Sequence, residues 1–332
     1  MLAKKEVMLS GIQPTANLTL GNYLGAIRNW VAMNKDFDSY FFVVDLHAIT
    51  VRQDPRLLRD STRFAVATYI AAGLDPENCS LFIQSHVPEH AQLAWVLNCY
   101  GYMGELSRMT QYKDKSARVG SNIPVGVFTY PLLMAADILL YDGKSVPVGA
   151  DQKQHVELTR DLAQRFNALY GADALVVPEP IIGQVGARVM DLQDPRAKMS
   201  KSAENPKGTV FLNDTSKQIE KKFKGAMTDS GDRIEFDVES KPGVSNLLSI
   251  QSAFTGKSLK DLEATYEGKL YGHLKVDTAD IVVEQLAPMQ ERTQEILSDP
   301  AELDRVLQKG AEKARCKASS TLKRVYERIG FL

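Results

Sequence analysis

Short apolar runs alternate with longer amphipathic segments through the first half of the chain. Three runs have the length and the aromatic or β-branched content of buried strands: residues 6–9, 40–44 and 81–83. Between them, apolar residues recur at helical spacing over residues 21–31, and a second helical segment, residues 55–72, begins after the N-cap Asp54. This β-α-β-α-β order predicts an α/β fold with a doubly wound parallel sheet.

The strand pattern is interrupted after the third run. Residues 91–102 and 105–117 are expected to form two helices, and we take residues 88–128 as a helical insertion. Such an insertion is either a dimer surface or lid, or simply an exposed helical hairpin. The α/β pattern then resumes with an almost wholly apolar helix at 129–141, a strand at 145–148 and a helix at 152–167.

The last third of the chain has no strong strand run and reads as helices from residue 215 onward. The simplest division is an α/β domain at residues 1–203 and an all-α C-terminal domain at 204–332, whose last helix we expect to pack back on the first domain. Two of its segments are basic, residues 215–224 and 313–328. Such runs are solvated helix faces or phosphate contacts, and their composition leaves both interpretations open.

Composition narrows the class of protein. The 332 residues are 44% hydrophobic and 24% charged, as in globular proteins, and contain no apolar run of eighteen residues. The N-terminus lacks the apolar core of a signal peptide, so we expect a soluble, cytoplasmic protein that does not span a membrane. The three cysteines are far apart, which argues against a structural metal. A net charge of -1 gives no overall attraction to nucleic acid, so any RNA must be bound by local patches.

The strongest chemical signal is the pentapeptide Lys198-Met199-Ser200-Lys201-Ser202. Lysine ammonium groups suit phosphate oxygens, and serine hydroxyls and loop N–H groups add donors, so this loop is typical of a polyphosphate site. A solvated basic loop is the alternative. The specified five-residue word should occur by chance in a chain of this length only about once in ten thousand sequences.

A second candidate phosphate site lies near the N-terminus, where a strand, a polar loop and a helix follow one another. Thr19 and Asn22 are three residues apart, so both project from the same side of the first helical turn. A helix N-terminus attracts anions through its free N–H groups and its dipole. Simple capping of the helix by Thr19 or Asn22 is the alternative.

Two carboxylates and a histidine are further candidates. Asp137 is the single carboxylate of the apolar helix, so it either reaches solvent or is hydrogen-bonded, because burying an unpaired carboxylate is prohibitive. Asp151 follows the fourth strand, where it either caps the next helix, with Gln154 as its reciprocal partner, or accepts hydrogen bonds from a ribose. His47 follows the second strand, at the edge where open α/β sheets bind ligands.

Several motifs occur in a fixed order over essentially the whole chain. They are Ser10-Gly11-Ile12-Gln13-Pro14, Thr19-Leu20-Gly21-Asn22, residues 43–50, residues 133–141, residues 146–155 and the lysine loop Lys198–Ser202. Together they resemble the bacterial tryptophanyl-tRNA synthetases, which are class I aminoacyl-tRNA synthetases. Thr19 and Asn22 stand where the usual first signature of the class has histidines, and Ala150 stands where relatives commonly have an acid.

The resemblance implies a Rossmann-like catalytic domain of the HUP type and a helical, anticodon-binding C-terminal domain. It implies activation of L-tryptophan by ATP, with Mg2+ carried by the nucleotide and no metal held by protein side chains, followed by transfer to tRNA(Trp). A homodimer is implied as well. The three scattered cysteines of this chain argue against the iron–sulfur cluster that some relatives carry.

The same resemblance assigns roles to individual residues. Catalytic roles fall to Thr19, Asn22, Lys115, Lys198 and Lys201. Contacts with ATP fall to Gln13, Gly21, Asn22, Gly149, Ala150, Asp151, Val189, Lys198, Met199, Ser200, Lys201 and Ser202. Contacts with tryptophan fall to Gly11, His47, Tyr130, Met134, Asp137, Val146, Val148 and Gln152.

Within this assignment, Asp137 has a clear chemical purpose. The indole N–H is only a donor, so a carboxylate at the bottom of an apolar pocket is a fitting acceptor, and phenylalanine would leave that carboxylate unpaired. Tyrosine also offers a donor, so the length of the pocket near Met134, Val146 and Val148 has to exclude it. The alternatives are a tyrosyl-tRNA synthetase, a catalytically inactive synthetase-like binding protein and a small-molecule nucleotidyltransferase.

Overall fold

A parallel sheet lies at the centre of the structure, a computed structural model that describes residues 5–14, 18–113, 122–147, 152–181, 188–200 and 205–332. Its hydrogen-bonded strands are β1 (Val7–Ile12), β2 (Asp38–Val43) and β3 (Ser80–Ile83), in the order β1-β2-β3. Successive residues of β2 face opposite sides: Phe41 joins one hydrophobic cluster and Phe42 joins another. The sheet is therefore buried on both faces, as the continuous apolar run predicted.

A second parallel pair extends this arrangement. β4 (Ser145–Pro147) pairs with β5 (Glu179–Ile181), and β4 lies beside β1. The strands thus continue from β1 in two directions, which confirms the doubly wound α/β fold and makes the carboxyl end of β1 a topological switch point. β5 is a strand that the sequence did not predict, because it lies in a passage rich in proline and glycine.

The helices of the α/β lobe largely follow the predicted order. They are α1 (Leu20–Asn22), the π-helical turn η1 (Tyr23–Ile27), α2 (Arg28–Met33), α3 (Asp45–Ala48), α4 (Pro55–Ala71), α5 (Glu89–Asn98), α6 (Met103–Arg108), α8 (Val125–Leu139) and α9 (Lys153–Tyr170). Asp54 caps α4 as predicted, since its Oδ1 accepts hydrogen bonds from the N–H groups of Arg56 and Leu57 at 2.9 and 3.0 Å.

Two local predictions in this lobe are wrong. The helix expected at 105–117 is broken at Met109, whose backbone is extended. Gln154 does not cap the following helix, because the N-cap of α9 is Gln152. Oε1 of Gln154 instead accepts hydrogen bonds from the N–H and the hydroxyl of Thr110, both at 3.0 Å, and so ties the segment after α6 to the start of α9. Asp151 lies outside the described residues.

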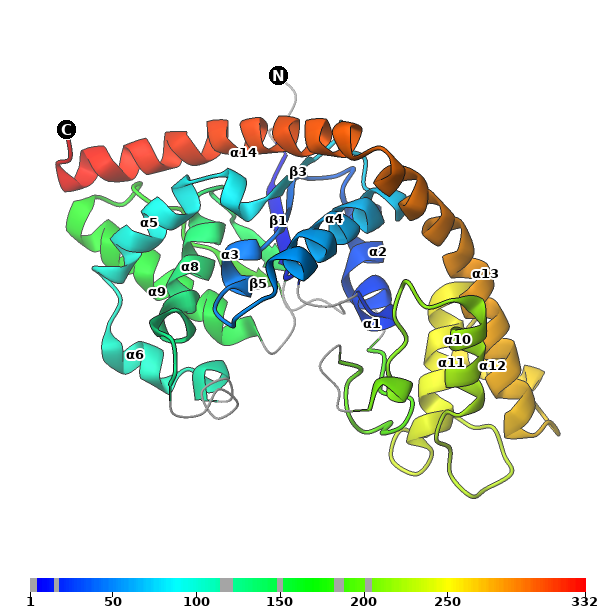
Figure 1. The fold of residues 1–332 in the computed structure, drawn as a ribbon. Helices are drawn as coiled ribbons and strands as arrows, with labels where there is room; N and C mark the ends of the chain where they lie inside the picture. The colour runs from blue at the N-terminus through cyan, green and yellow to red at the C-terminus, as the bar shows by residue number, and fades with distance from the viewer. Residues whose placement is uncertain (1–4, 15–17, 114–121, 148–151, 182–187, 201–204) are drawn as a thin grey trace.

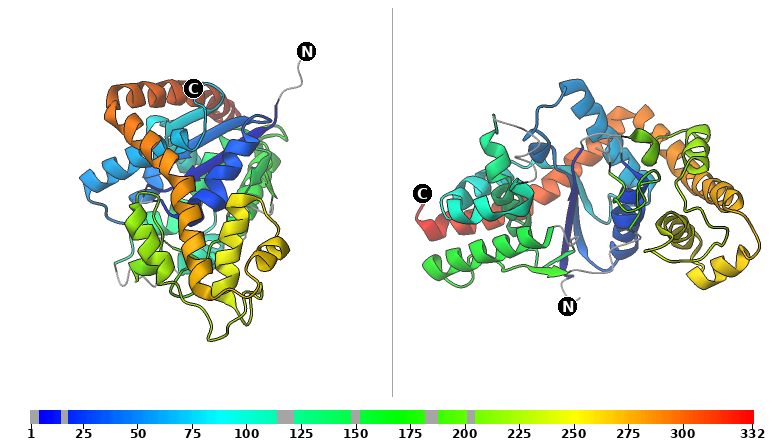
Figure 2. Two further views of the ribbon diagram at one scale, coloured as in Figure 1. Left: turned by 90° about the vertical axis from the view of Figure 1, so that its right-hand side faces the viewer. Right: turned by 90° about the horizontal axis from the view of Figure 1, so that it is seen from below.

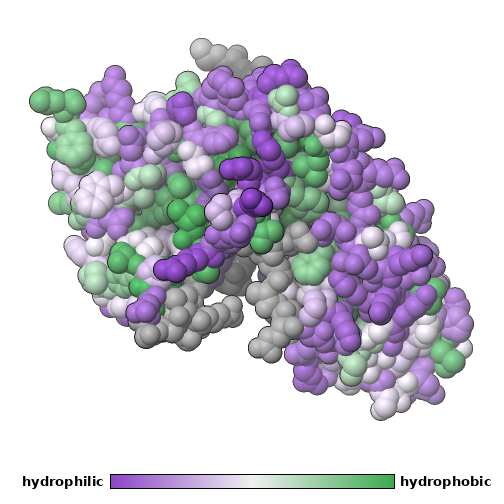
Figure 3. All heavy atoms as spheres, in the orientation of Figure 1, coloured by the Kyte–Doolittle hydropathy of each residue, from purple (hydrophilic) through white to green (hydrophobic). Residues whose placement is uncertain are grey.

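A C-terminal lobe of helices lies to the other side of the sheet from α5, α6, α8 and α9 (Figures 1 and 2). It contains α10 (Ser216–Lys224), α11 (Pro242–Thr255), α12 (Leu259–Thr265) and α13 (Tyr271–Ser298). On the face that Figure 3 shows, the C-terminal lobe is mostly hydrophilic. The division near residue 203 stays a prediction, because buried side chains on both sides of it belong to one hydrophobic cluster.

The last helix, α14 (Pro300–Ile329), runs back across the α/β lobe and packs on β3 and α5 (Figure 1). Basic side chains of this helix hold it there: Lys317 and Arg324 both pair with Asp142, and Arg315 donates to the carbonyl of His86. These members of the basic segment therefore serve intramolecular contacts. In the described part of the chain, no helix combines the length and the apolar character needed to cross a membrane.

Candidate active site

The carboxylate of Asp137 is the centre of a buried polar cluster. Its Oδ1 accepts hydrogen bonds from Nε2 of Gln84 and Nδ1 of His90, both at 2.6 Å, and its Oδ2 lies 2.8 Å from Nε2 of His47. All four side chains are buried. Of the two interpretations that the sequence left open, solvent exposure of Asp137 is therefore wrong and hydrogen bonding is correct.

The fold brings this cluster together at the carboxyl edge of the sheet. His47 lies in α3, directly after β2, and Gln84 comes directly after β3. The carboxyl ends of neighbouring parallel strands meet at one edge, so both side chains can reach the same point. His90 and Asp137 are supplied by α5 and α8, two helices that pack against each other.

The cluster keeps Asp137 ionised. Burial by itself would raise the pKa of this carboxyl, but the hydrogen bonds and the charges of His47 and His90 outweigh it and hold the pKa below its ordinary range. The hydroxyl of Tyr141 lies 2.8 Å from Nε2 of His90, on the far side of the ring from Asp137. Burial, and then the neighbouring Asp137, raise the pKa of Tyr141, so this hydroxyl keeps its proton.

Tyr130 continues the site along α8. Its ring meets the His47 ring edge-on at a centroid distance of 6.2 Å, and its hydroxyl lies 2.9 Å from Nε2 of His155. Burial raises the pKa of Tyr130, which keeps the hydroxyl neutral. The structure thus brings Tyr130, Asp137 and His47 to one region.

Smaller side chains of the predicted pocket lie on neighbouring elements. Val146 of β4 is buried and Met134 of α8 is half-buried. Gly11 lies near the end of β1, where a Cβ atom would come within 2.7 Å of Cγ1 of Val44, so only glycine fits between the strands there without rearrangement. Gln152 starts α9, and Val148 lies outside the described residues.

The second part of the site is the start of α1. Thr19 is its N-cap, and it forms a reciprocal capping box with Asn22: Oγ1 of Thr19 accepts from the Asn22 N–H at 3.2 Å, and Oδ1 of Asn22 accepts from the Thr19 N–H at 2.9 Å. The capping interpretation is therefore confirmed. A π-helical turn follows at once, a distortion that is frequent at functional sites.

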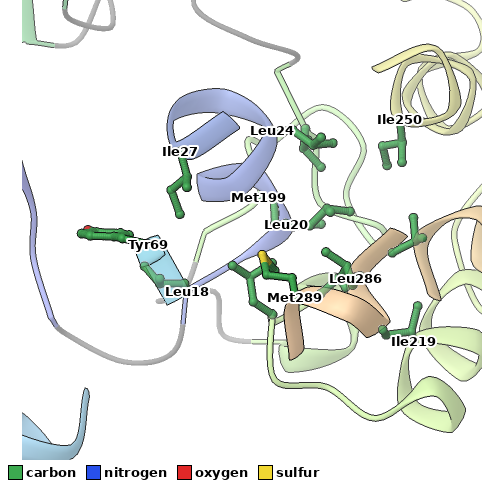
Figure 4. Close-up of a cluster of buried hydrophobic side chains, with 14 of the residues drawn as sticks. Leu18, Leu20, Leu24, Ile27, Tyr69, Met199, Ile219, Ile250, Leu286 and Met289 are labelled. Atoms are coloured by element: carbon green, nitrogen blue, oxygen red, sulfur yellow. The ribbon is translucent and has the colours of Figure 1, made fainter. Parts of the chain in front are cut away.

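The lysine loop lies against this helix start. A Cβ atom placed on Gly21 would lie 3.7 Å from Cβ of Val189 and 3.9 Å from Cβ of Met199. Met199 is buried and lies in the same hydrophobic cluster as Leu20 (Figure 4). Lys198 next to it is exposed. Two motifs that are far apart in the sequence are thus in contact, through Gly21 on one side and Met199, the neighbour of Lys198, on the other.

This arrangement matches one family of enzymes. A family model described as tRNA synthetases class I (W and Y), for tryptophan and tyrosine, matches residues 3–287. The chain belongs to this family. Tryptophan–tRNA ligase 2 of Streptomyces avermitilis is 56% identical over 334 residues, which cover 100% of this chain and 99% of that relative.

Solved structures of the family have the same fold. The tryptophanyl-tRNA synthetase of Mycoplasma pneumoniae superposes with a TM-score of 0.91 at 37% identity and covers 99% of this chain and 98% of its own. The enzyme of Campylobacter jejuni, solved as a complex with ADP and tryptophan, superposes with a TM-score of 0.84 at 35% identity, over 98% of this chain and 100% of its own. The class I synthetase fold of this chain follows from these matches.

Not every residue expected from the family can be placed. Lys115, Gly149, Ala150, Asp151, Lys201 and Ser202 lie outside the described residues, as Val148 does. Gln13 follows β1 at the switch point, and Ser200 accepts a hydrogen bond at its carbonyl from Thr209 at 3.0 Å.

Four side chains of this synthetase site were missed in the sequence: Gln84, His90, Tyr141 and His155. Gln84 could have been found, because it is a polar residue directly after a strand, as His47 is. His90 and His155 lie inside helices and Tyr141 lies just after α8, and a single sequence gives no signal that separates these three from ordinary buried polar residues.

Proposed function

We propose that this chain activates L-tryptophan with ATP, forming tryptophanyl-adenylate and pyrophosphate, and then transfers the tryptophanyl group to tRNA(Trp). The observation that carries the proposal is the state of Asp137. This carboxylate is buried, is kept ionised, and accepts three hydrogen bonds from the described side chains around it. A carboxylate offers about four acceptor positions, so one more donor completes it, and the indole N–H is such a donor.

The same geometry explains rejection of other aromatic amino acids. Phenylalanine brings no donor and would bury the last acceptor position of Asp137 without a partner, which costs about 1 to 3 kcal/mol or more for a charged group. Tyrosine also has a donor, its hydroxyl, at the far end of a ring that extends along a longer axis. Its exclusion then depends on the depth of the pocket, to which Met134 and Val146 contribute.

The phosphates of ATP would lie at the start of α1. The positive end of the helix dipole lies there, Met199 of the lysine loop lies against this helix start, and we expect its neighbour Lys198, together with Lys201, to supply positive charge to the phosphates. The tryptophan carboxylate attacks the α-phosphorus and the pyrophosphate leaves with its electrons. The protein aligns the two reactants and stabilises the charge that develops on the leaving group, with Mg2+ bound to the phosphates sharing that load.

The assembly that we propose is a cytoplasmic homodimer that binds tRNA. Large apolar side chains are exposed on the helical insertion, at Trp95 of α5, with 72% of its surface exposed, and at Tyr102 and Met103 at the start of α6. Exposed aromatic side chains and methionine are typical of protein interfaces. They support a dimer surface on α5 and α6.

Charging of isolated tRNA tests the proposal. Purified protein, ATP, Mg2+ and total tRNA are incubated with each labelled amino acid, and acid-insoluble label is counted. We expect label from tryptophan alone. If the well-folded protein showed neither exchange nor charging activity, an inactive synthetase-like binding protein would be favoured instead.

A further inference from the structure

The lysine loop begins on a short antiparallel hairpin. The N–H of Met199 donates to the carbonyl of Val189 at 3.0 Å, the N–H of Asp191 donates to the carbonyl of Ala197 at 2.9 Å, and Met190 pairs with Lys198. Hydrogen bonds alternate in direction along a strand. The N–H and the carbonyl of Met190 therefore point away from the arm that carries Lys198.

Asn246 of α11 occupies this outer edge. Its Oδ1 accepts from the N–H of Met190 at 2.9 Å, and its Nδ2 donates to the carbonyl of Met190 at 2.9 Å. The side-chain amide thus takes both positions that a third strand would take. Asn246 is buried, with 4% of its surface exposed, in the interior of a helix where asparagine is a poor helix former.

Further hydrogen bonds hold the turn end of the hairpin on the C-terminal lobe. The N–H of Met227 donates to the carbonyl of Leu192 at 2.7 Å, and Nε2 of Gln193 donates to the carbonyl of Gly225 at 2.7 Å. These bonds hold the turn end of the hairpin. Asn246 holds the end next to Lys198 and Met199, where a small displacement is passed directly to the lysine loop.

We propose that Asn246 is a positioning residue for the activation step, because it fixes the hairpin that carries Lys198 at the correct distance from the start of α1. This inference rests on the proposed function, in which Lys198 stabilises the leaving pyrophosphate. The role requires both bonds: the acceptor and the donor of one amide hold one peptide group in a single orientation. Asn246 touches no substrate atom and acts through Met190 and Lys198.

The test is Asn246→Leu, which keeps the approximate size of the side chain and removes both hydrogen bonds. The matched control is Gln251→Met, since Gln251 lies in the same helix, is also buried, and makes its hydrogen bonds to Tyr266 and Thr278 inside the C-terminal lobe. Kinetics of tryptophan-dependent ATP/pyrophosphate exchange, affinity for tryptophan by calorimetry, and thermal unfolding are measured for both variants.

We expect Asn246→Leu to lower kcat for exchange about ten- to hundredfold, the usual cost of a small misplacement, while the Kd for tryptophan changes less than about twofold. Gln251→Met should lose comparable thermal stability and keep its kcat. Equal effects on kcat in the two variants, or an unchanged kcat in Asn246→Leu, would overturn the inference.

A second variant covers the case in which Asn246→Leu does not fold. Asn246→Asp keeps the acceptor for the Met190 N–H, replaces the donor with an oxygen and brings a negative charge next to the Met190 carbonyl, so its kcat should fall at least about threefold with tryptophan affinity retained. A wild-type kcat in this variant also overturns the inference. Failure of the proposed function is separate, since it would appear as absence of tryptophan-dependent exchange in the wild-type protein.

Discussion

Nδ1 of His90 lies 2.6 Å from Oδ1 of Asp137, and both atoms are buried. An ionised carboxylate can only accept, so the ring carries a proton on Nδ1. On the far side of the ring, Nε2 of His90 lies 2.8 Å from the hydroxyl of Tyr141. Tyr141 and His90 thus form a support that orients the carboxylate from behind.

Removal of the Tyr141 hydroxyl should loosen this support. Tyr141→Phe leaves His90 without the partner that fixes its orientation, so we expect tryptophan affinity to fall by about 1 kcal/mol, the usual value of a neutral hydrogen bond. Preference for tryptophan over an analogue with sulfur in place of the indole N–H should narrow, as measured by competition in the exchange assay. Tyr100→Phe is the control, because its hydroxyl bonds to Tyr170 at 2.7 Å. Identical losses in both variants would speak against the support.

Asp137→Ala should weaken the recognition of tryptophan. Loss of a hydrogen bond to a charged group predicts tryptophan binding weaker by about 2 to 3 kcal/mol, which calorimetry can measure. Selectivity against phenylalanine should fall in parallel, since no acceptor is then left unpaired. An unchanged ratio of exchange rates for the two amino acids would show that Asp137 does not read the indole.

The low pKa of Asp137 predicts a dependence of stability on pH. The folded state binds its proton less readily than the unfolded state does, so this carboxylate stabilises the fold fully above the unfolded pKa of about 4 and loses that effect as pH falls below it. The free energy of unfolding is measured by urea denaturation from about pH 3 to about pH 6 for wild type and Asp137→Asn. As pH rises through the acid range, the free energy of unfolding of the wild type should increase by up to about 1.4 kcal/mol per pH unit more than that of Asp137→Asn. A constant difference at all pH values would contradict this.

Gly310 tests how α14 is held on the sheet. A Cβ at this position would lie 1.9 Å from the carbonyl oxygen of Leu81 in β3, so Gly310→Ala should destabilise the protein by about 1 to 3 kcal/mol. Gly272 of α13 is a matched helical glycine with nothing within 4 Å of its Cβ position, and Gly272→Ala should be neutral or stabilising by up to about 1 kcal/mol. Similar melting temperatures for the two variants would show that α14 does not depend on this close contact.

Much of the fold was predictable because its signals are local. The buried strand β2 and the Asp54 cap of α4 depend on residues that lie next to each other in the chain. The predictions failed where residues far apart in the sequence determine the contact. Gln154 bonds to Thr110 and does not cap the helix, and Gln84 and His90 reach Asp137 only through the packing of β3, α5 and α8. Likewise, no spacing rule connects Asn246 to Met190, although the bonds between them are clear in three dimensions.

The measurement that tests the account most directly is ATP/pyrophosphate exchange with each of the twenty amino acids. Purified protein is incubated with Mg2+, ATP, labelled pyrophosphate and one amino acid at a time, and label in ATP is followed. We predict exchange that depends on tryptophan, because only its indole N–H both reaches and completes the Asp137 carboxylate. Exchange stimulated by tyrosine and not by tryptophan would contradict the account.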